Sequence, residues 1–327
     1  MFEIKTPSRI HMTLIDMNGS FGRIDGSVGL ALSDGGVWMR AQKSDTDTVT
    51  VTQWSDGSIR EPMPDFVDYV RHAAKCLLPP NAGIELEFLS PVRQHVGLGS
   101  GTQIALSVAA AVNDLYSLGK SVRELAQLTR RGGTSGIGVL AFEKGGFIMD
   151  AGHKTELKSG FLPSSKSNAP PADLMLRMDF PNWDVVVALP PACGISGNAE
   201  KDFFQKHCPI PIDDVQKVSH ILLMKMLPSL AENDIEEFGN AVNDLQKAGF
   251  KKYEAAIQPK SVKETAELML KCGVHGAGIS SFGPAVYGFS ENKKQSEEIK
   301  SILLEKMPAG SDVLITKANN TGAKKNV

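Results

Sequence analysis

The sequence predicts an α+β protein with two domains. Its 327 residues are 42% hydrophobic and 22% charged, which is ordinary for a globular protein and sufficient for two hydrophobic cores. Short segments with strand periodicity open the N-terminal part, whereas the C-terminal part combines strands and helices in a recognisable order. Residues 159–182 lie between these parts and are rich in Ser, Pro, Asn and Lys, as expected of a connecting loop. We therefore expect one domain over residues 1–165 and another over residues 166–327.

The N-terminal domain begins with strands and continues with helices. Apolar and polar residues alternate over residues 9–14, which predicts a strand with one core face and one polar face. Apolar residues at helical spacing over residues 66–77 predict a helix. Further along, Ser121 and Glu124 have the spacing of a capping box and predict the start of another helix.

A Gly-rich segment, Pro91–Gln103, lies between a predicted strand over residues 84–88 and a predicted helix over residues 104–119. It contains three glycines: Gly97, Gly99 and Gly101. Glycine allows tight turns and close approach of the backbone to a ligand, and a following helix directs the positive end of its dipole to the same place. The segment could also be only a flexible turn, but its position between strand and helix favours a phosphate or pyrophosphate site.

The C-terminal domain has the strand and helix order of a ferredoxin-like fold. The predicted elements are a strand over 185–189, helices over 198–207, 214–230 and 234–247, a helix capped by Ser261 with Glu264 and ending at Gly273, strands over 274–280 and 285–289, a helix over 293–306 and a strand over 312–316. With one helix counted between the first two strands, the order is β-α-β-β-α-β, with extra helices. This pattern predicts a split antiparallel sheet covered by helices.

Composition excludes several classes of function. Lys plus Arg number 35 and Asp plus Glu number 37, so there is no basic excess to hold a nucleic acid. The four cysteines are too widely spaced for a zinc site and suit reduced thiols. No apolar run of 18 residues and no signal-peptide core is found, so we expect a cytoplasmic protein without membrane contact.

Two further Gly-rich strings accompany the first. Gly132–Gly146 is expected to join a helix to a strand, and Gly276–Ala285 lies between two predicted strands. The second of these is by composition a hairpin turn. Together with Pro91–Gln103 it would also suit an anionic substrate held between the domains, with Ser280 and Gly283 at the contact.

In this order and spacing, the three strings resemble the three motif regions of the GHMP kinase superfamily, which includes galactokinase, homoserine kinase and mevalonate kinase. The resemblance extends over nearly the whole chain. It implies an N-terminal domain similar to ribosomal protein S5 domain 2, a ferredoxin-like C-terminal domain and a phosphate-bearing donor on the Gly-rich loop.

The chain departs from the kinases where they keep their base. In mevalonate kinase-like and galactokinase-like members the corresponding string reads Pro-Ser-Gly-x-Asp, and the Asp deprotonates the acceptor hydroxyl. Here Thr134-Ser-Gly-Ile137 is followed by Gly138. Since a general base contributes ~100- to 10,000-fold, an ATP-dependent small-molecule kinase becomes the alternative interpretation.

One branch of the superfamily fits this departure. Residues 8–19, 22–26 and 95–103 resemble the β-ribofuranosylaminobenzene 5′-phosphate synthase family of archaeal methanopterin biosynthesis. The resemblance implies transfer of ribose 5-phosphate from phosphoribosyl pyrophosphate to the ring carbon that bears the carboxylate of 4-hydroxybenzoate or 4-aminobenzoate. Pyrophosphate and CO₂ leave. The sequence leaves the choice between the two acceptors open, and from the resemblance alone we expect a homodimer.

This chemistry assigns roles to candidate residues. The pyrophosphate is expected on Gly97, Gly99, Ser100, Gly101, Thr102 and Gln103. Mg²⁺ is expected mainly on the pyrophosphate itself, with Thr102 as a candidate ligand. Asp16 or Asp25 could stabilise the ribosyl oxocarbenium ion electrostatically, although both also lie in good turn sequences.

Cationic and polar groups complete the predicted site. The benzoate carboxylate and the 5-phosphate need cations, for which the candidates are Arg9, His11, Arg23, Arg93 and His95. His11 is also a candidate catalytic residue, and Ser280 and Gly283 are candidate substrate contacts. A third interpretation, a binding module that keeps the fold without catalysis, would leave the polar face of residues 9–14 unexplained.

Overall fold

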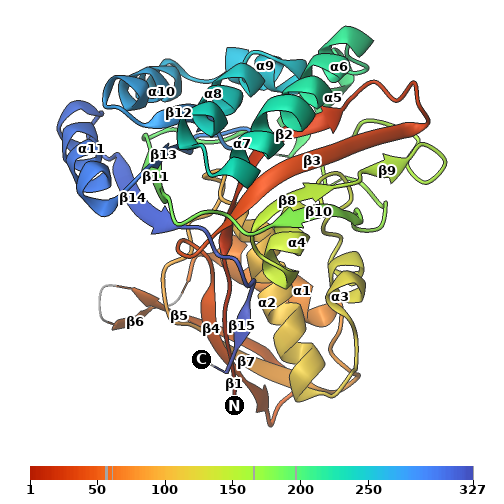
Figure 1. The fold of residues 1–327 in the computed structure, drawn as a ribbon. Coiled ribbons are helices and arrows are strands. Elements are labelled where there is room, and N and C mark those ends of the chain that lie inside the picture. Colours follow the sequence, from red (N-terminus) through yellow and green to blue (C-terminus); the bar gives the residue numbers. More distant parts are fainter. Residues whose placement is uncertain (56–57, 61, 165, 196, 327) are drawn as a thin grey trace.

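The computed structural model describes residues 1–55, 58–60, 62–164, 166–195 and 197–326 (Figure 1). Its first sheet has the strand order β15 (Lys324–Lys325), β1 (Phe2–Lys5), β4 (Trp38–Ser44), β7 (Gly83–Phe88), β5 (Val49–Ser55) and β6 (Ser58–Arg60). All neighbours are antiparallel except β5 and β7, which are parallel. Both chain ends therefore meet in one sheet, because β15 pairs with β1.

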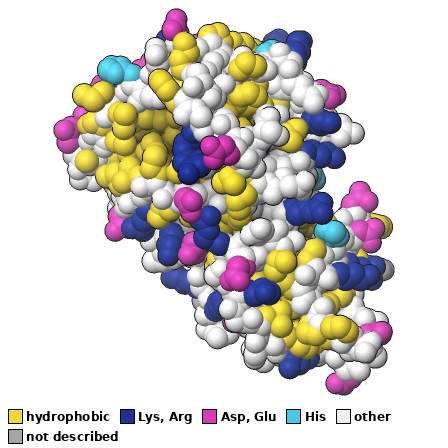
Figure 2. Space-filling model, turned by 90° about the vertical axis from the view of Figure 1, so that its right-hand side faces the viewer, with side chains coloured by type: hydrophobic (Ala, Val, Ile, Leu, Met, Phe, Trp, Pro, Cys, Tyr) yellow, Lys and Arg dark blue, Asp and Glu magenta, His cyan; other side chains and the backbone are white. Residues whose placement is uncertain are grey.

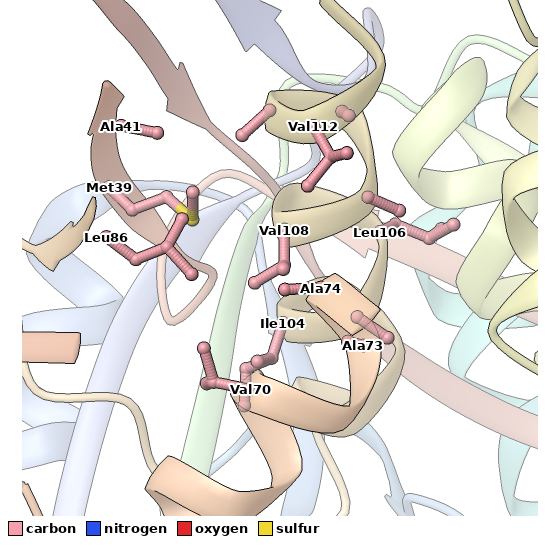
Figure 3. Close-up of a cluster of buried hydrophobic side chains, with 14 of the residues drawn as sticks. Met39, Ala41, Val70, Ala73, Ala74, Leu86, Ile104, Leu106, Val108 and Val112 are labelled. Atoms are coloured by element: carbon pink, nitrogen blue, oxygen red, sulfur yellow. The ribbon is translucent and has the colours of Figure 1, made fainter. Parts of the chain in front are cut away.

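Helices α1 (Pro64–Lys75) and α2 (Ser100–Leu115) cover one face of this sheet. Figure 3 shows Val108 and Val112 of α2 directed toward Met39 on β4, with Val70 of α1 nearby. Most α2 side chains are buried, as the Ala-rich sequence allows. The predicted capping box is confirmed, since Ser121 and Glu124 bond reciprocally at the start of α3 (Val122–Leu128).

The second sheet has the order β10 (Leu174–Met178), β8 (Phe147–Asp150), β3 (Arg23–Leu32) and β2 (Ser8–Asp16), and the short β9 (His153–Lys154) also pairs with β3. Helix α4 (Ile137–Glu143) packs on this sheet through Ile137, Leu140 and Ala141. The string Gly132–Gly146 was expected only to join a helix to a strand. It instead contains this helix, because its apolar residues are buried between the sheet and α2.

The third sheet confirms the ferredoxin-like prediction. Its order is β12 (His275–Ile279), β13 (Val286–Ser290), β11 (Asp184–Leu189) and β14 (Asp312–Lys317), with every neighbour antiparallel. Helices α10 (Lys260–Lys271) and α11 (Lys293–Lys306) pack on one face of this sheet. The other face shares a core with the second sheet.

Further helices lie around this shared core: α5 (Asn198–His207), α6 (Ile212–Ile221), the π-helical turn η1 (Leu222–Met226), α7 (Leu227–Glu232), α8 (Ile235–Leu245) and α9 (Gly249–Ala256). The sequence pattern did not predict α9. The predicted cap at Ser261 is wrong, because the N-cap of α10 is Pro259, two residues earlier. Ser261 therefore lies inside the helix, and its carbonyl accepts a hydrogen bond from the Thr265 hydroxyl.

The polar face of β2 is covered, in contrast to the simple alternation expected for a half-exposed strand. His11 and Thr13 are buried, and α9 packs against β2. Burying polar groups is costly unless they have partners or a function. This face therefore marks the place where a site is expected. No helix in the described ranges is long and apolar enough to cross a membrane.

Candidate active site

A cavity of about 480 Å³ lies between the start of α2 and the C-terminal helices. Residues from both halves of the chain line it. The N-terminal half contributes the Gly-rich loop and part of β2, and the C-terminal half contributes α5, α9 and the loop between β12 and β13. The predicted residues that line the cavity are Arg9, His11, His95, Gly97, Gly99, Ser100, Gly101, Thr102 and Gly283.

The Gly-rich loop has the geometry of a backbone anion cradle. Gly97 and Gly99 have φ of 89° and 76°, in the left-handed region that favours glycine. A Cβ on Gly97 would come within 2.7 Å of the carbonyl oxygen of Ser280. Helix α2 starts at Ser100, and within the described residues the amides of Ser100 and Gly101 have no hydrogen-bond acceptor. Two free donors and the helix dipole thus face the cavity.

Arg131 supplies a cation beside this helix start. Its guanidinium lies 5.1 Å from the centroid of the Tyr69 ring and donates to the Tyr69 hydroxyl. That hydroxyl in turn donates to the carbonyl oxygen of Gly101 at 2.7 Å. In the part of the chain that the structure describes, the Arg131 Nε has no acceptor and no carboxylate forms an ion pair with the guanidinium. No sequence motif pointed to Arg131, because the fold brings it to the start of α2 from the segment after α3.

Gly138 occupies the position that corresponds to the kinase Asp in the motif, and it faces Thr102. A Cβ on Gly138 would lie 3.1 to 3.2 Å from three side-chain atoms of Thr102, which is tighter than ordinary contact. Gln103 is fully buried and donates to the Gly138 carbonyl at 2.8 Å. Gln103 was expected to contact the pyrophosphate, but it does not line the cavity. It instead holds α2 against α4.

A hydrogen-bonded chain connects the cavity wall to a buried carboxylate. Ser135 lines the cavity, and its hydroxyl lies 2.7 Å from that of Ser27, which donates to Asp150. Asp150 also accepts the amides of Gly136 and Gly152 at 2.8 and 2.9 Å. Burial raises the pKa of Asp150 to about 6, against the opposing effect of these bonds. Asp150 thereby holds the loop before α4 in place.

Two residues on the polar face of β2 contribute nitrogen groups to the cavity. Arg9 donates to the carbonyl oxygen of Gly97 at 2.5 Å, and burial lowers its pKa to about 10, so it is cationic at neutral pH. Burial, Arg9 and Lys251 hold the pKa of His11 well below its usual range, which leaves the imidazole neutral. The Nδ1 of His11 has no hydrogen-bond partner among the described residues.

The C-terminal half adds two carboxylates that no sequence motif indicated. Glu254 on α9 forms an ion pair with Lys251 at 2.9 Å, and both side chains are buried. Glu200 on the first turn of α5 also lines the cavity. Burial and the charge of Glu254 raise the pKa of Glu200 to about 7, whereas Arg9 lowers it. Neither residue lies in a motif, so only the fold identifies them.

Apolar side chains form the adjoining wall. Phe204 lies one turn after Glu200 on α5, and its ring centroid is 6.1 Å from that of Phe282. Leu14 and Ile195 line the same cavity. This wall can accept an aromatic ring.

The structure corrects the expected placement of both aspartates, neither of which lines the cavity. Asp16 accepts the amides of Asn18 and Gly19 at 2.8 and 2.9 Å, as in a turn. Asp25 is fully buried; it forms an ion pair with Lys158 at 2.9 Å and a hydrogen bond with Nδ1 of His153 at 2.6 Å.

Three other predicted residues also lie outside the cavity lining. Arg23 donates to the carbonyl of Ala151, and Arg93 pairs with Asp312 at the surface. Ser280 is buried; it donates to the Gly97 carbonyl at 2.7 Å and accepts the His11 amide at 3.0 Å. Ser280 thus joins the loop to β2 without facing a ligand.

The described residues contain no group of three His, Cys, Asp or Glu side chains suited to a metal ion. Mg²⁺ does not require such a group, because it keeps several waters and is often bound through substrate phosphates. The Thr102 hydroxyl lies beside the anion cradle and is an oxygen ligand of the kind that Mg²⁺ prefers. The residues present therefore fit a magnesium pyrophosphate better than a metal held by protein alone.

Comparison with known proteins places the chain among its relatives. Residues 68–146 match the GHMP kinases N terminal domain, and residues 226–309 match the GHMP kinases C terminal family. The chain is 42% identical over 326 residues to the β-ribofuranosylphenol 5′-phosphate synthase of Methanothermobacter thermautotrophicus, which covers 98% of this chain and 97% of that protein. The synthase of Archaeoglobus fulgidus is 42% identical over 328 residues, covering 99% of each.

Solved structures share the fold at low identity. Homoserine kinase from Cytophaga hutchinsonii superposes with a TM-score of 0.69 at 18% identity, covering 99% of this chain and 96% of that one. L. major mevalonate kinase in complex with R-mevalonate gives a TM-score of 0.70 at 13% identity, covering 97% and 95%. These likenesses confirm the fold expected from the sequence.

Proposed function

This chain belongs to the family of the β-ribofuranosylphenol 5′-phosphate synthases, and from that membership we propose that it transfers ribose 5-phosphate from phosphoribosyl pyrophosphate to 4-hydroxybenzoate. The new bond is to the ring carbon that carries the carboxylate, and pyrophosphate and CO₂ are released in a step of methanopterin biosynthesis. Identity to named synthases along the whole chain carries this proposal. The relatives' name specifies a phenol product, which favours 4-hydroxybenzoate over 4-aminobenzoate.

The cavity has the groups that the donor requires. Departure of pyrophosphate leaves negative charge on its oxygens, and fixed donors stabilise such charge most effectively where water is excluded. The amides of Ser100 and Gly101, the α2 dipole and Arg131 supply these donors. Mg²⁺, when bound through the pyrophosphate with Thr102 nearby, would add charge neutralisation.

The remaining groups suit the acceptor. The ring of 4-hydroxybenzoate fits the wall formed by Phe204 and Phe282. Arg9 is the cavity cation on β2 and can orient the carboxylate before it leaves as CO₂. The unpartnered Nδ1 of His11 offers one hydrogen bond to the bound substrates.

The relatives favour this reaction over the alternative of a kinase. The local geometry agrees, because Gly138 has no side chain and Thr102 lies against it. A base at this position would have to displace Thr102.

The purified protein is expected to convert phosphoribosyl pyrophosphate and 4-hydroxybenzoate to the ribosylphenol phosphate when Mg²⁺ is present. ³¹P NMR should show pyrophosphate, and acceptor labelled with ¹³C at the carboxyl should release labelled CO₂ in equal amount. Chelation of Mg²⁺ should abolish turnover. Absence of both products, or formation of ADP when ATP and an alcohol are supplied instead, would refute the proposal.

We also propose that the protein is a homodimer with Leu223 and Met224 in its interface. These neighbouring side chains of η1 are 58% and 68% exposed, and Figure 2 shows hydrophobic side chains gathered on the upper part of one face. Large exposed apolar patches favour association. Light scattering should give twice the monomer mass of 35.2 kDa, and the double variant L223K/M224K should give a monomer. A monomeric wild type would contradict this proposal.

A further inference from the structure

Glu200 stands apart from the other cavity carboxylate. Glu254 is neutralised by Lys251 at 2.9 Å. Glu200 has no cation within ion-pair distance in the ranges that the structure describes, although it lines the same cavity. A carboxylate without an ion-pair partner is therefore held at the wall where the acceptor is proposed to bind.

The other charged and titratable side chains that line the cavity with Glu200 are Arg9 and His11 on β2, Tyr69 on α1, His95 on the Gly-rich loop, Arg131 after α3, and Glu254 on α9. Lys251, also on α9, is the ion-pair partner of Glu254. Of these groups, Glu254 and Arg9 act on Glu200 through their charges. Burial and the charge of Glu254 bring the pKa of Glu200 to about 7. A carboxylate in this range is an effective proton acceptor at neutral pH.

Resting on the proposed function, we infer that Glu200 is the general base that removes the proton from the 4-hydroxyl group of the acceptor. Its position on the first turn of α5, four residues before Phe204, places the carboxylate beside the wall proposed for the aromatic ring. The ring carbon that must attack the ribose lies para to the hydroxyl. Ionising the hydroxyl increases electron density at that carbon.

The proton and electron changes balance. The acceptor O–H bond breaks, its proton moves to the Glu200 carboxylate, and the oxygen electron pair becomes delocalised into the ring. The para carbon forms a bond to C1′ of the ribose as the C1′–O bond to pyrophosphate breaks. The bond from that carbon to the carboxylate then breaks, CO₂ leaves, and its electron pair restores the aromatic ring. Glu200 returns the proton to the phenolate oxygen.

The variant E200Q tests this inference through the choice of acceptor. With 4-hydroxybenzoate, kcat/KM should fall about 100-fold or more, since a general base contributes ~100- to 10,000-fold. With 4-aminobenzoate the loss should be less than about 5-fold, because the neutral amine already donates its lone pair to the ring. Equal losses with both acceptors, or no loss with 4-hydroxybenzoate, would overturn the inference.

Two further readouts apply even if 4-aminobenzoate is a poor acceptor. For the wild type, kcat/KM with 4-hydroxybenzoate should fall as the pH drops below about 7, because protonated Glu200 cannot accept a proton; E200Q should lack this dependence. The deficit of E200Q should also shrink with 3,5-difluoro-4-hydroxybenzoate, whose more acidic phenol needs no base. The role of Glu200 as a base would be contradicted if the wild type and E200Q had the same pH profile. It would also be contradicted if the loss of kcat/KM in E200Q were the same with the difluorinated acceptor as with 4-hydroxybenzoate.

Asp202 provides a matched control. It lies two residues later on α5 and is exposed, so D202N removes the same charge from the same helix outside the cavity. Its kcat/KM should stay within about twofold of the wild type with either acceptor. If the wild type turns over neither acceptor, the proposed function fails. If the wild type is active and E200Q is equally active, only the role of Glu200 fails.

Discussion

Replacing Arg131 by methionine is expected to lower kcat/KM for phosphoribosyl pyrophosphate by about 100- to 1,000-fold. The guanidinium lies beside the start of α2, packs on Tyr69 and has no carboxylate partner within the described residues. Its charge is thus available to the departing pyrophosphate. Removing one preorganised donor at such a position typically lowers the rate by about 100- to 1,000-fold. Methionine keeps the apolar contact with Tyr69, so the fold should be retained. Steady-state kinetics with varied donor measure the effect.

The neighbouring Arg130 offers the matched control, because its side chain is exposed. The variant R130M loses the same charge and should keep donor kcat/KM within about twofold. R131K should lie between R131M and the wild type, since a lysine retains charge but not the planar pair of donors. Equal kinetics for R130M and R131M would show that Arg131 does not bind the donor.

Replacing Asp25 by asparagine should lower the free energy of unfolding by about 3 to 5 kcal/mol. Asp25 is the buried partner of both Lys158 and His153, and removing one member of a buried charge cluster leaves the others uncompensated. Lys158 also donates to Thr134 at 2.8 Å and to the carbonyl oxygen of Leu162 at 3.2 Å. The cluster therefore holds the loop after β9 against the cavity wall. Urea unfolding followed by circular dichroism and fluorescence measures the loss.

Replacing Asp16 by asparagine is the control. Comparing D16N with D25N distinguishes a structural role of Asp25 from a catalytic one. In D16N the amide oxygen can still accept from Asn18 and Gly19, so stability should change by less than about 1 kcal/mol. For D25N under conditions where it remains folded, kcat should stay within a few-fold of the wild type. A D25N protein of wild-type stability but with strongly reduced kcat would restore the electrostatic role suggested by the sequence.

Local sequence determined those features in which neighbouring residues decide the conformation. The capping box of Ser121 and Glu124 needs only residues three apart. The Gly-rich loop likewise needs glycines where φ is positive and a helix directly after them. Ser261 shows the limit of such reasoning, because the helix starts at Lys260 after Pro259 and leaves a plausible capping pair inside it.

Which side chains meet was decided by tertiary structure. Arg131, Glu200 and Glu254 are separated along the chain and belong to no motif, yet they line one cavity. Asp25 has the sequence context of a turn, but it is buried because Lys158 and His153 reach it from more than 120 residues away.

Sequence patterns were enough to predict the fold, the family and the Gly-rich loop that precedes α2. Periodicity, glycine placement and motif order are properties of short segments, so a single chain can show them. Which charged groups form ion pairs and which remain available to a ligand became clear only from the folded structure. Ion pairs and burial depend on contacts between distant segments. Asp25 and Glu254 have buried cationic partners, whereas Glu200 and Arg131 form no ion pair among the described residues.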